Sequence, residues 1–268
     1  MMTKVRRAAV AGTFYPSSRE ELNRTVEDFL SEVETPKSQK FPKGLIVPHA
    51  GYIYSGPIAA TAYAILKPFA SQIRRVILLG PAHRFPVRGL ALSDAEWFET
   101  PLGNVEVDLE ATRQISKLSQ VKSSLPAHES EHSLEVQLPF LQKVLTDFKV
   151  VPLVVGDARP ESVAEVVEML WGGLETIFVV SSDLSHYLPY ELARKTDRQT
   201  VDEILKFDVP IAHDCACGAT PINGFLVAAQ KHHLKGELLD LRNSGDTAGD
   251  RRQVVGYSAF AFTDPQDG

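Results

Sequence analysis

The chain has 268 residues, of which 44% are hydrophobic and 23% are charged. This composition is typical of a soluble globular protein, and the length is sufficient for one domain with its own core, so we expect a single domain over residues 1–268. The net charge of −6 excludes the positive field that would hold nucleic acid. The apolar residues after Arg7 are too few for a signal peptide or a membrane span, which predicts a cytoplasmic protein that binds neither nucleic acid nor membrane.

Helix-like segments alternate with short apolar runs along the chain, a βαβ pattern that predicts an α/β fold. In chain order, the predicted helices are Arg19–Val33, Ala59–Leu66, Leu109–Ser119, Leu134–Leu145, Glu161–Leu170, Leu192–Phe207 and Pro221–His232. The predicted strands include residues 44–47, 76–79, 150–155, 177–180, 237–241 and 254–262. Between Gly89 and Asp108 the pattern changes to strands around a turn, so we expect the sheet to be mixed.

Three of the apolar runs stop shortly before a histidine: His49, His83 and His186. Because such runs are typical of buried strands, each histidine is predicted to lie just beyond the carboxyl end of a strand. In an open α/β sheet this edge is where binding sites form. Three histidines at one topological position therefore indicate a shared site.

His49 and His83 are candidate metal ligands. Each lies in a tight segment that contains glycine, and two histidines with one anionic group leave positions open for water, dioxygen or substrate. The alternative is a pair of loop histidines bonded to nearby carbonyls. His186 follows Asp183 closely enough for the carboxylate to orient its imidazole, which suits acid–base chemistry, although Asp183 would equally serve as a turn cap.

The two cysteines, Cys215 and Cys217, are separated by a single residue, a spacing that disfavours an internal disulfide. Both are expected to be thiols in a reducing compartment. Cys217 precedes a predicted helix at Pro221, whose dipole would favour a thiolate. A free cysteine is more often an inert small side chain, and nothing local distinguishes Cys217 from Cys215.

Residues 128–132 match His-Glu-x-x-His, the zinc-protease signature. In such proteases both histidines lie on one face of an established helix. Here Pro126 and the polar surroundings place the match at a loop-to-helix boundary, which disfavours the protease interpretation. Instead, Glu131 and His132 are predicted to begin the following helix, which Pro139 weakens or kinks, and His132 is a candidate pocket residue.

Several segments together resemble the Memo family, in the family's order and over essentially the whole chain. They are Val10-Ala11-Gly12-Thr13-Phe14-Tyr15-Pro16, Pro48-His49-Ala50-Gly51-Tyr52-Ile53-Tyr54-Ser55-Gly56, Gly80-Pro81-Ala82-His83, Glu131-His132-Ser133-Leu134-Glu135, Ser181-Ser182-Asp183-Leu184-Ser185-His186, Cys217-Gly218 and Asn243-Ser244-Gly245-Asp246-Thr247. Memo proteins are similar in fold to class III extradiol dioxygenases, so the resemblance implies a three-layer α/β/α domain with a mixed, largely parallel sheet. It also implies a functional link to a radical S-adenosylmethionine protein.

The resemblance further implies that His49, His83 and Cys217 are metal ligands and that Asp183 and His186 lie beside the metal. Cys217 is chosen over Cys215 because the family motif is Cys followed by Gly. The dioxygenases use a carboxylate where this chain has a thiolate. Because a soft thiolate favours copper or alters the redox potential of iron, ring-opening activity does not follow from the likeness.

Three functional hypotheses result. The first is an Fe(II)- or copper-dependent oxidoreductase in which His186 and Asp183 handle protons and Tyr52 and Tyr54 line the pocket, unless the two tyrosines only pack against the loop. The second is a non-catalytic module that binds a small molecule or peptide in the same pocket. The third is a hydrolase with Cys217 as nucleophile, His186 as base and Asp183 as orienting residue.

Overall fold

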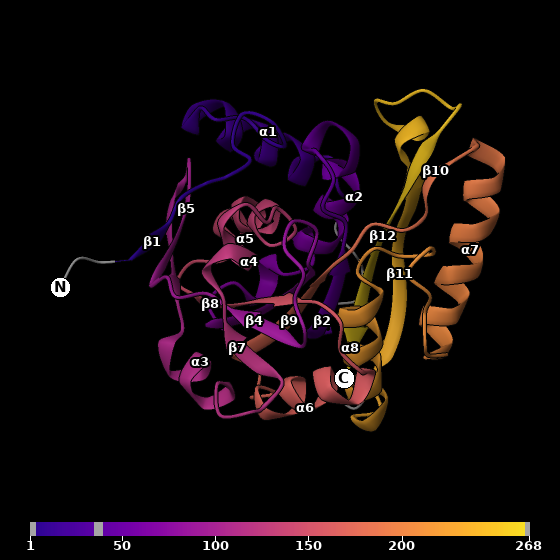
Figure 1. Cartoon of the computed structure of the whole chain (residues 1–268). Coiled ribbons are helices and arrows are strands. Elements are labelled where there is room, and N and C mark those ends of the chain that lie inside the picture. The colour runs from indigo at the N-terminus through magenta and orange to yellow at the C-terminus, as the bar shows by residue number, and fades with distance from the viewer. Residues whose placement is uncertain (1–3, 35–39, 266–268) are drawn as a thin grey trace.

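The middle of the molecule is an open, mixed β-sheet with helices packed on both of its faces (Figure 1). The structure, a computed structural model, describes residues 4–34 and 40–265. Residues 1–3, at the start of the short segment that was considered for a signal peptide, lie outside the described residues. Among the residues described, no helix has the length and apolar character that crossing a membrane requires.

The central strands of the sheet run parallel to one another, and antiparallel pairs lie toward its two sides. In spatial order the strands are β1 (Val5–Arg6), β5 (Trp97–Thr100), β6 (Gly103–Val107), β8 (Lys149–Val155), β3 (Arg75–Pro81), β9 (Thr176–Ser181), β2 (Pro42–Val47), β12 (Val254–Thr263) and β10 (His186–Leu188). In addition, β11 (Lys235–Asn243) pairs with β12, while β4 (Leu90–Leu92) pairs with β8 and β7 (Val121–Ser123). The parallel pairs β8·β3, β3·β9 and β9·β2 and the antiparallel pairs β5·β6 and β2·β12 confirm the predicted mixed, largely parallel sheet.

Two hydrophobic clusters cover the two faces of this sheet. One contains residues of α1 (Arg19–Ser31), α2 (Tyr52–Ala64), α4 (Leu125–Glu129) and α5 (Leu138–Val144). The other contains residues of α3 (Leu109–Ile115), α6 (Pro160–Met169), α7 (Tyr190–Lys206) and α8 (Ala219–Lys231). Short 3-10 helices η1 (Lys67–Phe69), η2 (Glu135–Gln137) and η3 (Ser244–Asp246) connect these elements. The arrangement has three layers, as the family resemblance implied.

Successive side chains of β2 point to opposite faces of the sheet, which shows how the sequence produces these layers. Leu45 and Val47 belong to the first cluster and Ile46 to the second, as expected for successive side chains of a strand buried on both faces. Gly44 allows α8 to pack closely, because a Cβ at this position would lie 2.2 Å from the Phe225 ring. Burial on both faces is what makes this strand a continuous apolar run in the sequence.

The observed helices differ from the predicted ones in their bounds; the helix expected over Leu109–Ser119 ends at Ile115, and two further differences involve a proline. The helix expected from Ala59 begins earlier, at Tyr52, and continues through Pro57. The gain from burying most of this helix outweighs the lost backbone hydrogen bond at proline. The helix expected over Leu134–Leu145 starts as η2, and Pro139 lies in the first turn of α5, where its missing N–H has no intrahelical partner to lose.

The arrangement of β3, β9 and β2 positions the candidate site. These three strands are neighbours and parallel, so their carboxyl ends meet at one edge. His83 follows the end of β3, Asp183 follows the end of β9, and His49 follows the end of β2. Residues far apart in the sequence therefore converge at the edge where open α/β sheets bind ligands.

Candidate metal centre

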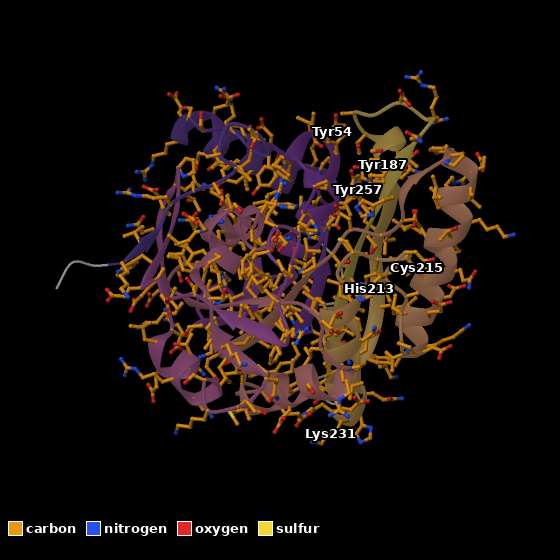
Figure 2. All side chains as sticks on the ribbon, viewed as in Figure 1. Tyr54, Tyr187, His213, Cys215, Lys231 and Tyr257 are labelled. Carbon is orange, nitrogen blue, oxygen red and sulfur yellow. The ribbon has the colours of Figure 1, made fainter. Side chains whose placement is uncertain are left out.

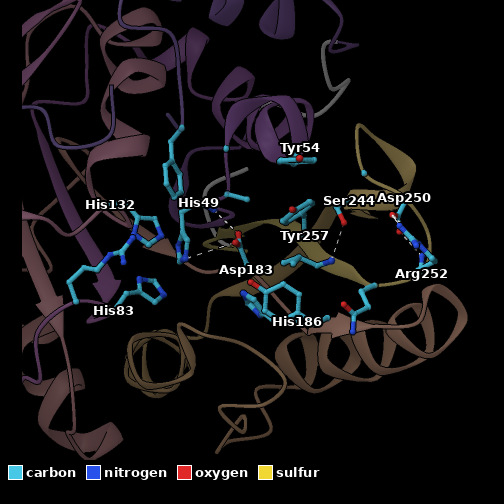
Figure 3. Close-up of a pocket in the computed structure, with 18 residues that line it drawn as sticks. His49, Tyr54, His83, His132, Asp183, His186, Ser244, Asp250, Arg252 and Tyr257 are labelled. Atoms are coloured by element: carbon cyan, nitrogen blue, oxygen red, sulfur yellow. Dashed lines mark hydrogen bonds and ion pairs between the residues drawn. The ribbon is translucent and has the colours of Figure 1, made fainter. Parts of the chain in front are cut away.

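The side chains of His49, His83 and His132 converge at the carboxyl edge of the sheet (Figure 3). One ring nitrogen from each lies within 4.8 Å of the other two. The His83 and His132 rings stack with centroids 4.6 Å apart, and the His49 ring meets them edge-on at 5.1 and 5.4 Å. Side-chain exposure is 2% for His49, 12% for His132 and 27% for His83, so the group lies at the bottom of an open cavity.

The tautomer of His49 is determined by Ser181. The Ser181 hydroxyl lies 2.6 Å from the carbonyl oxygen of Ser133, which can only accept, so the single hydroxyl proton is used there. Gln137 Nε2 donates to the same hydroxyl oxygen at 2.8 Å. His49 Nδ1, 2.9 Å from Ser181 Oγ, must therefore donate its proton. The Nε2 atom of His49 keeps its lone pair, as a metal ligand requires.

Glu131 determines the orientation of His83 in the same way. Its Oε1 lies 2.9 Å from His83 Nδ1, and its Oε2 accepts the backbone N–H of His83 at 2.6 Å. Burial alone would raise the pKa of Glu131, but the hydrogen bond and the charge of His83 outweigh it and lower the pKa to about 2. Because an ionised carboxylate only accepts, His83 Nδ1 donates and its Nε2 lone pair is available.

His132, unlike His49 and His83, has a buried Nδ1 atom whose hydrogen-bonding capacity is not satisfied. Its Nδ1 atom is buried and has no hydrogen-bond partner, and it lies 3.4 Å from Glu131 Oε1 without a bond. The ring packs against Phe14, with centroids 4.6 Å apart. An unpaired buried nitrogen beside two oriented imidazoles is the environment in which a bound cation would satisfy a polar atom.

Burial favours the neutral form of two histidines of this group, His49 and His132. It lowers the pKa of His49 well below its usual range and that of His132 to about 4, and the neighbouring imidazoles add to the effect. Three imidazole rings beside an ionised Glu131 form a donor set that suits a transition-metal cation. The residues present therefore fit a metal ion of the kind that the family resemblance implies.

Asp183 contacts His49 rather than His186. Its Oδ1 accepts the backbone N–H of His49 at 2.7 Å, and its Oδ2 lies 4.0 Å from His49 Nε2. Burial raises the pKa of Asp183 to about 6, although the bond from His49 opposes the shift. His186 Nδ1 instead donates to the carbonyl of Leu184 at 2.8 Å. The orienting contact expected between Asp183 and His186 is not formed, because Asp183 follows β9, the strand that pairs with β2, and so lies against His49.

Cys217 contacts His49 but does not line the wider cavity onto which the three histidines open. Its Sγ is 3.3 Å from His49 Nε2 and accepts the backbone N–H of Asp183 at 3.3 Å. Burial, with the charge of Asp183, raises the pKa of the Cys217 thiol to about 12, which opposes the expected thiolate. Cys217 is not in the group of three ligand atoms that lie within 4.8 Å of one another. Both Cys215 and Cys217 are free thiols, as expected.

A cavity of about 1030 Å³ opens from the histidines toward the loop before β12 (Figure 3). We call it the wide cavity. His49, His83, His132, Asp183 and His186 line it near the sheet edge, so the three histidines that follow strands do border one space. Its other lining residues are Phe14, Ala50, Gly51, Tyr54, Arg84, Tyr187, Ser244, Gly249, Asp250, Arg252, Gln253, Val255 and Tyr257.

The two tyrosines expected in the pocket have different positions. Tyr54 lines the wide cavity beside Tyr257 (Figure 3). Tyr52 does not line it. That ring is 3% exposed and packs against Tyr15 and Phe140, and its hydroxyl donates to the carbonyl of Val136. Tyr52 is therefore a core residue, because the helix that begins with it directs successive side chains to different sides.

The His-Glu-x-x-His match does not form a zinc-protease helix. The helix α4 ends at Glu129, so the five residues span its end. His128 is buried and its Nε2 donates to the carbonyl of Ala91 at 2.9 Å, whereas His132 lies in the three-histidine group. His128 and His132 therefore do not share one metal-binding site, as a zinc protease would require.

Sequence reasoning did not identify Ser181, Gln137 and Glu131 as the residues that orient the histidines. Ser181 and Glu131 lie inside the segments that resemble the Memo family, which was the available signal. The loop from Gly249 to Gln253 was also missed as a wall of the cavity. Its polar composition resembles any exposed turn, so only the fold reveals its position.

Comparisons with known proteins agree with this architecture. The family model described as "Memo-like protein" matches residues 6–261. A "MEMO1 family protein" of Aquifex aeolicus is 40% identical and covers 97% of this chain and 99% of its own length. A second, from Methanosarcina acetivorans, is 38% identical and covers 96% and 98%.

One solved structure, titled an uncharacterized protein JW3007 from Escherichia coli K12, shares the fold. It superposes with a TM-score of 0.53 at 14% identity and covers 81% of this chain and 98% of its own. The match to the family model over nearly the whole chain, together with relatives of similar length at this level of identity, identifies the protein as a member of the Memo family.

Proposed function

We propose that the protein binds one Fe(II) or copper ion at the carboxyl edge of the sheet and uses it in redox chemistry on a ligand held in the wide cavity. The observation that carries the proposal is the convergence of His49, His83 and His132, in which Ser181 and Glu131 orient two of the rings. Such hydrogen bonds to the second ring nitrogen are typical partners of metal-binding histidines.

His49 and His83 are the first two proposed ligands. Two residues are candidates for the third. His132 completes the compact group, whereas Cys217, which the family resemblance implies, contacts His49 Nε2 but lies outside that group. Three imidazoles suit iron, copper and zinc alike, and a thiolate ligand would favour copper. Variants of His132 and Cys217 distinguish the two sets.

A bound iron or copper ion would supply one-electron chemistry and an open position for dioxygen. The chain itself supplies the surroundings. Asp183, whose burial raises its pKa to about 6, lies where a proton can be held beside His49 Nε2. His186 borders the same cavity, and its bond to Leu184 fixes Nδ1 as the donor, leaving Nε2 to accept a proton from a ligand.

The size and walls of the wide cavity favour a second function, the binding of a small molecule or peptide without catalysis. A volume of about 1030 Å³ is at the upper end for small-molecule sites, and Tyr54, Tyr257 and Phe14 provide aromatic surface. Oxygen consumption by the metal-loaded protein separates the two functions. Oxygen consumption that depends on His49 and His83 supports the oxidoreductase. Metal binding without oxygen consumption supports the binding module.

The hydrolase hypothesis has less support. The imidazole next to the Cys217 sulfur is that of His49, and His186 bonds to Leu184 rather than to Asp183. The proposal retains a cytoplasmic location and a functional link to a radical S-adenosylmethionine protein, both of which rest on sequence reasoning. Metal analysis of anaerobically purified protein tests the proposal directly.

A further inference from the structure

A second cavity, of about 370 Å³, lies beside the candidate metal centre, and we call it the narrow cavity. Cys217 lines the narrow cavity and is absent from the lining of the wide one. His49 lines the wide cavity but not the narrow one, and His83 borders both cavities. The 3.3 Å contact between Cys217 Sγ and His49 Nε2 therefore joins a group of one cavity to a group of the other.

The two cavities open in different parts of the molecule. His213, an exposed residue of the narrow cavity, is well separated in Figure 2 from Tyr54, Tyr187 and Tyr257 of the wide cavity. His213 Nε2 lies 3.2 Å from the Thr220 hydroxyl at the start of α8. Access to the sulfur thus lies between the start of α8 and the segment that follows β3.

The chemistry of the two linings also differs. The wide cavity is lined by charges of both signs, Arg84 and Arg252 with Asp183 and Asp250, whereas the narrow cavity has no lysine or arginine among its described lining residues and contains Asp157. Its remaining surface is largely apolar, formed by Pro81, Ala82, Pro86, Val87, Val155 and Pro221. Asp157 is the only acidic side chain among the described lining residues of the narrow cavity, and its charge repels an anion.

We propose that the site has two separate approaches, and that a small uncharged molecule reaches the sulfur of Cys217 through the narrow cavity while the wide cavity serves the histidines. The volume suits a small molecule, and the lining selects against negative charge. This assignment does not depend on the proposed metal or redox activity, because it concerns only which cavity leads to the sulfur.

Alkylation of the sulfur tests the proposal without an activity assay. In a Cys215→Ser background Cys217 is the sole cysteine of the chain. The full chain, freed of metal with a chelator, is treated with neutral iodoacetamide or anionic iodoacetate, and modification of Cys217 is followed by mass spectrometry. After normalisation to the rates of the unfolded chain, iodoacetamide is expected to react several-fold faster than iodoacetate.

Blocking variants locate the approach. His213→Trp and Pro86→Trp place a bulky ring at two exposed positions of the narrow cavity, and Arg252→Trp is the matched exposed change in the wide cavity. The first two are expected to slow alkylation several-fold and the third to leave it unchanged. Slowing by Arg252→Trp alone, slowing by none of the three, or equal normalised rates for the two reagents would each overturn the proposal.

Discussion

The Nδ1 atom of His83 lies 2.9 Å from Oε1 of Glu131, and the same carboxylate accepts the backbone N–H of His83. Glu131 thus fixes both the position and the tautomer of a ring that faces the wide cavity. Orientation of this kind raises the basicity of a metal-binding imidazole. The relationship connects a buried carboxylate to the proposed function.

Glu131→Gln is expected to lower the affinity for Fe(II) or copper by about 10- to 100-fold, because the amide orients the imidazole less firmly and lacks the charge. Titration of the metal-free protein measures the affinity. Glu129→Gln, an exposed change at the end of α4, is the matched control and should bind as tightly as the wild type. Equal affinities for both variants would show that Glu131 does not support a metal ligand.

Adjacent arginines provide a test of the core that supports the site. Arg6 is buried, pairs with the fully buried Glu135, and donates to the carbonyls of His128 and Glu131, whereas Arg7 pairs with Glu99 at the surface. Removing one partner of a buried pair leaves an uncompensated charge, so Arg6→Met should lower the free energy of unfolding by about 3–5 kcal/mol. Arg7→Met should change it by less than about 1 kcal/mol. Chemical denaturation measures both, and similar losses would contradict this explanation.

The pH dependence of stability tests the burial of Asp197. This residue of α7 is 2% exposed and accepts the backbone N–H of Ser185 at 3.0 Å. Burial raises its pKa from 3.8 to about 6, so between these values the folded state binds more protons than the unfolded state. Its contribution therefore makes stability fall as pH rises from about 4 to 6, by an amount on the order of 2–3 kcal/mol.

Asp197→Asn should remove this slope, because the amide accepts the same bond without titrating. Unfolding free energies measured from pH 4 to 8 provide the comparison. Asp202→Asn, an exposed change on the same helix, is the control that should keep the wild-type slope. A slope that survives in Asp197→Asn would mean that another group is responsible.

Copper spectroscopy distinguishes the two candidates for the third ligand. If Cys217 binds copper, its thiolate gives an intense visible charge-transfer absorption that Cys217→Ser removes. If His132 completes the site, His132→Ala weakens copper binding and Cys217→Ser leaves both affinity and spectrum nearly unchanged. The compact histidine group favours the second result. Loss of binding in Cys217→Ser with full binding in His132→Ala would favour the ligand set implied by the resemblance.

Much of the fold could be predicted because the central strands are buried on both faces. Such strands form unmistakable apolar runs, as in β2, β3 and β9, and their parallel alignment places the following residues at one edge. Short elements such as β10 lack this signal, and within β10 Tyr187 has a φ of 57°, which no strand pattern anticipates.

The site was harder to predict than the edge on which it lies. Hydrogen-bond partners depend on how strands pair, so Asp183 contacts His49 across β9 and β2 rather than His186 in its own segment. Similarly, α2 begins at Tyr52 rather than at Ala59, and its Gly56 packs against the Phe29 ring of α1, a contact that local sequence does not reveal. Tertiary packing overrode the local preferences at both places.

The most direct test of the account is the metal content of anaerobically purified protein and its variants. The wild type and His233→Asn, a change at an exposed histidine outside the site, should each contain about one iron or copper ion per chain. His49→Ala and His83→Ala should contain far less while remaining folded by circular dichroism. A wild-type protein that is free of metal and takes up none, or His49→Ala and His83→Ala proteins that retain the wild-type amount, would contradict the account.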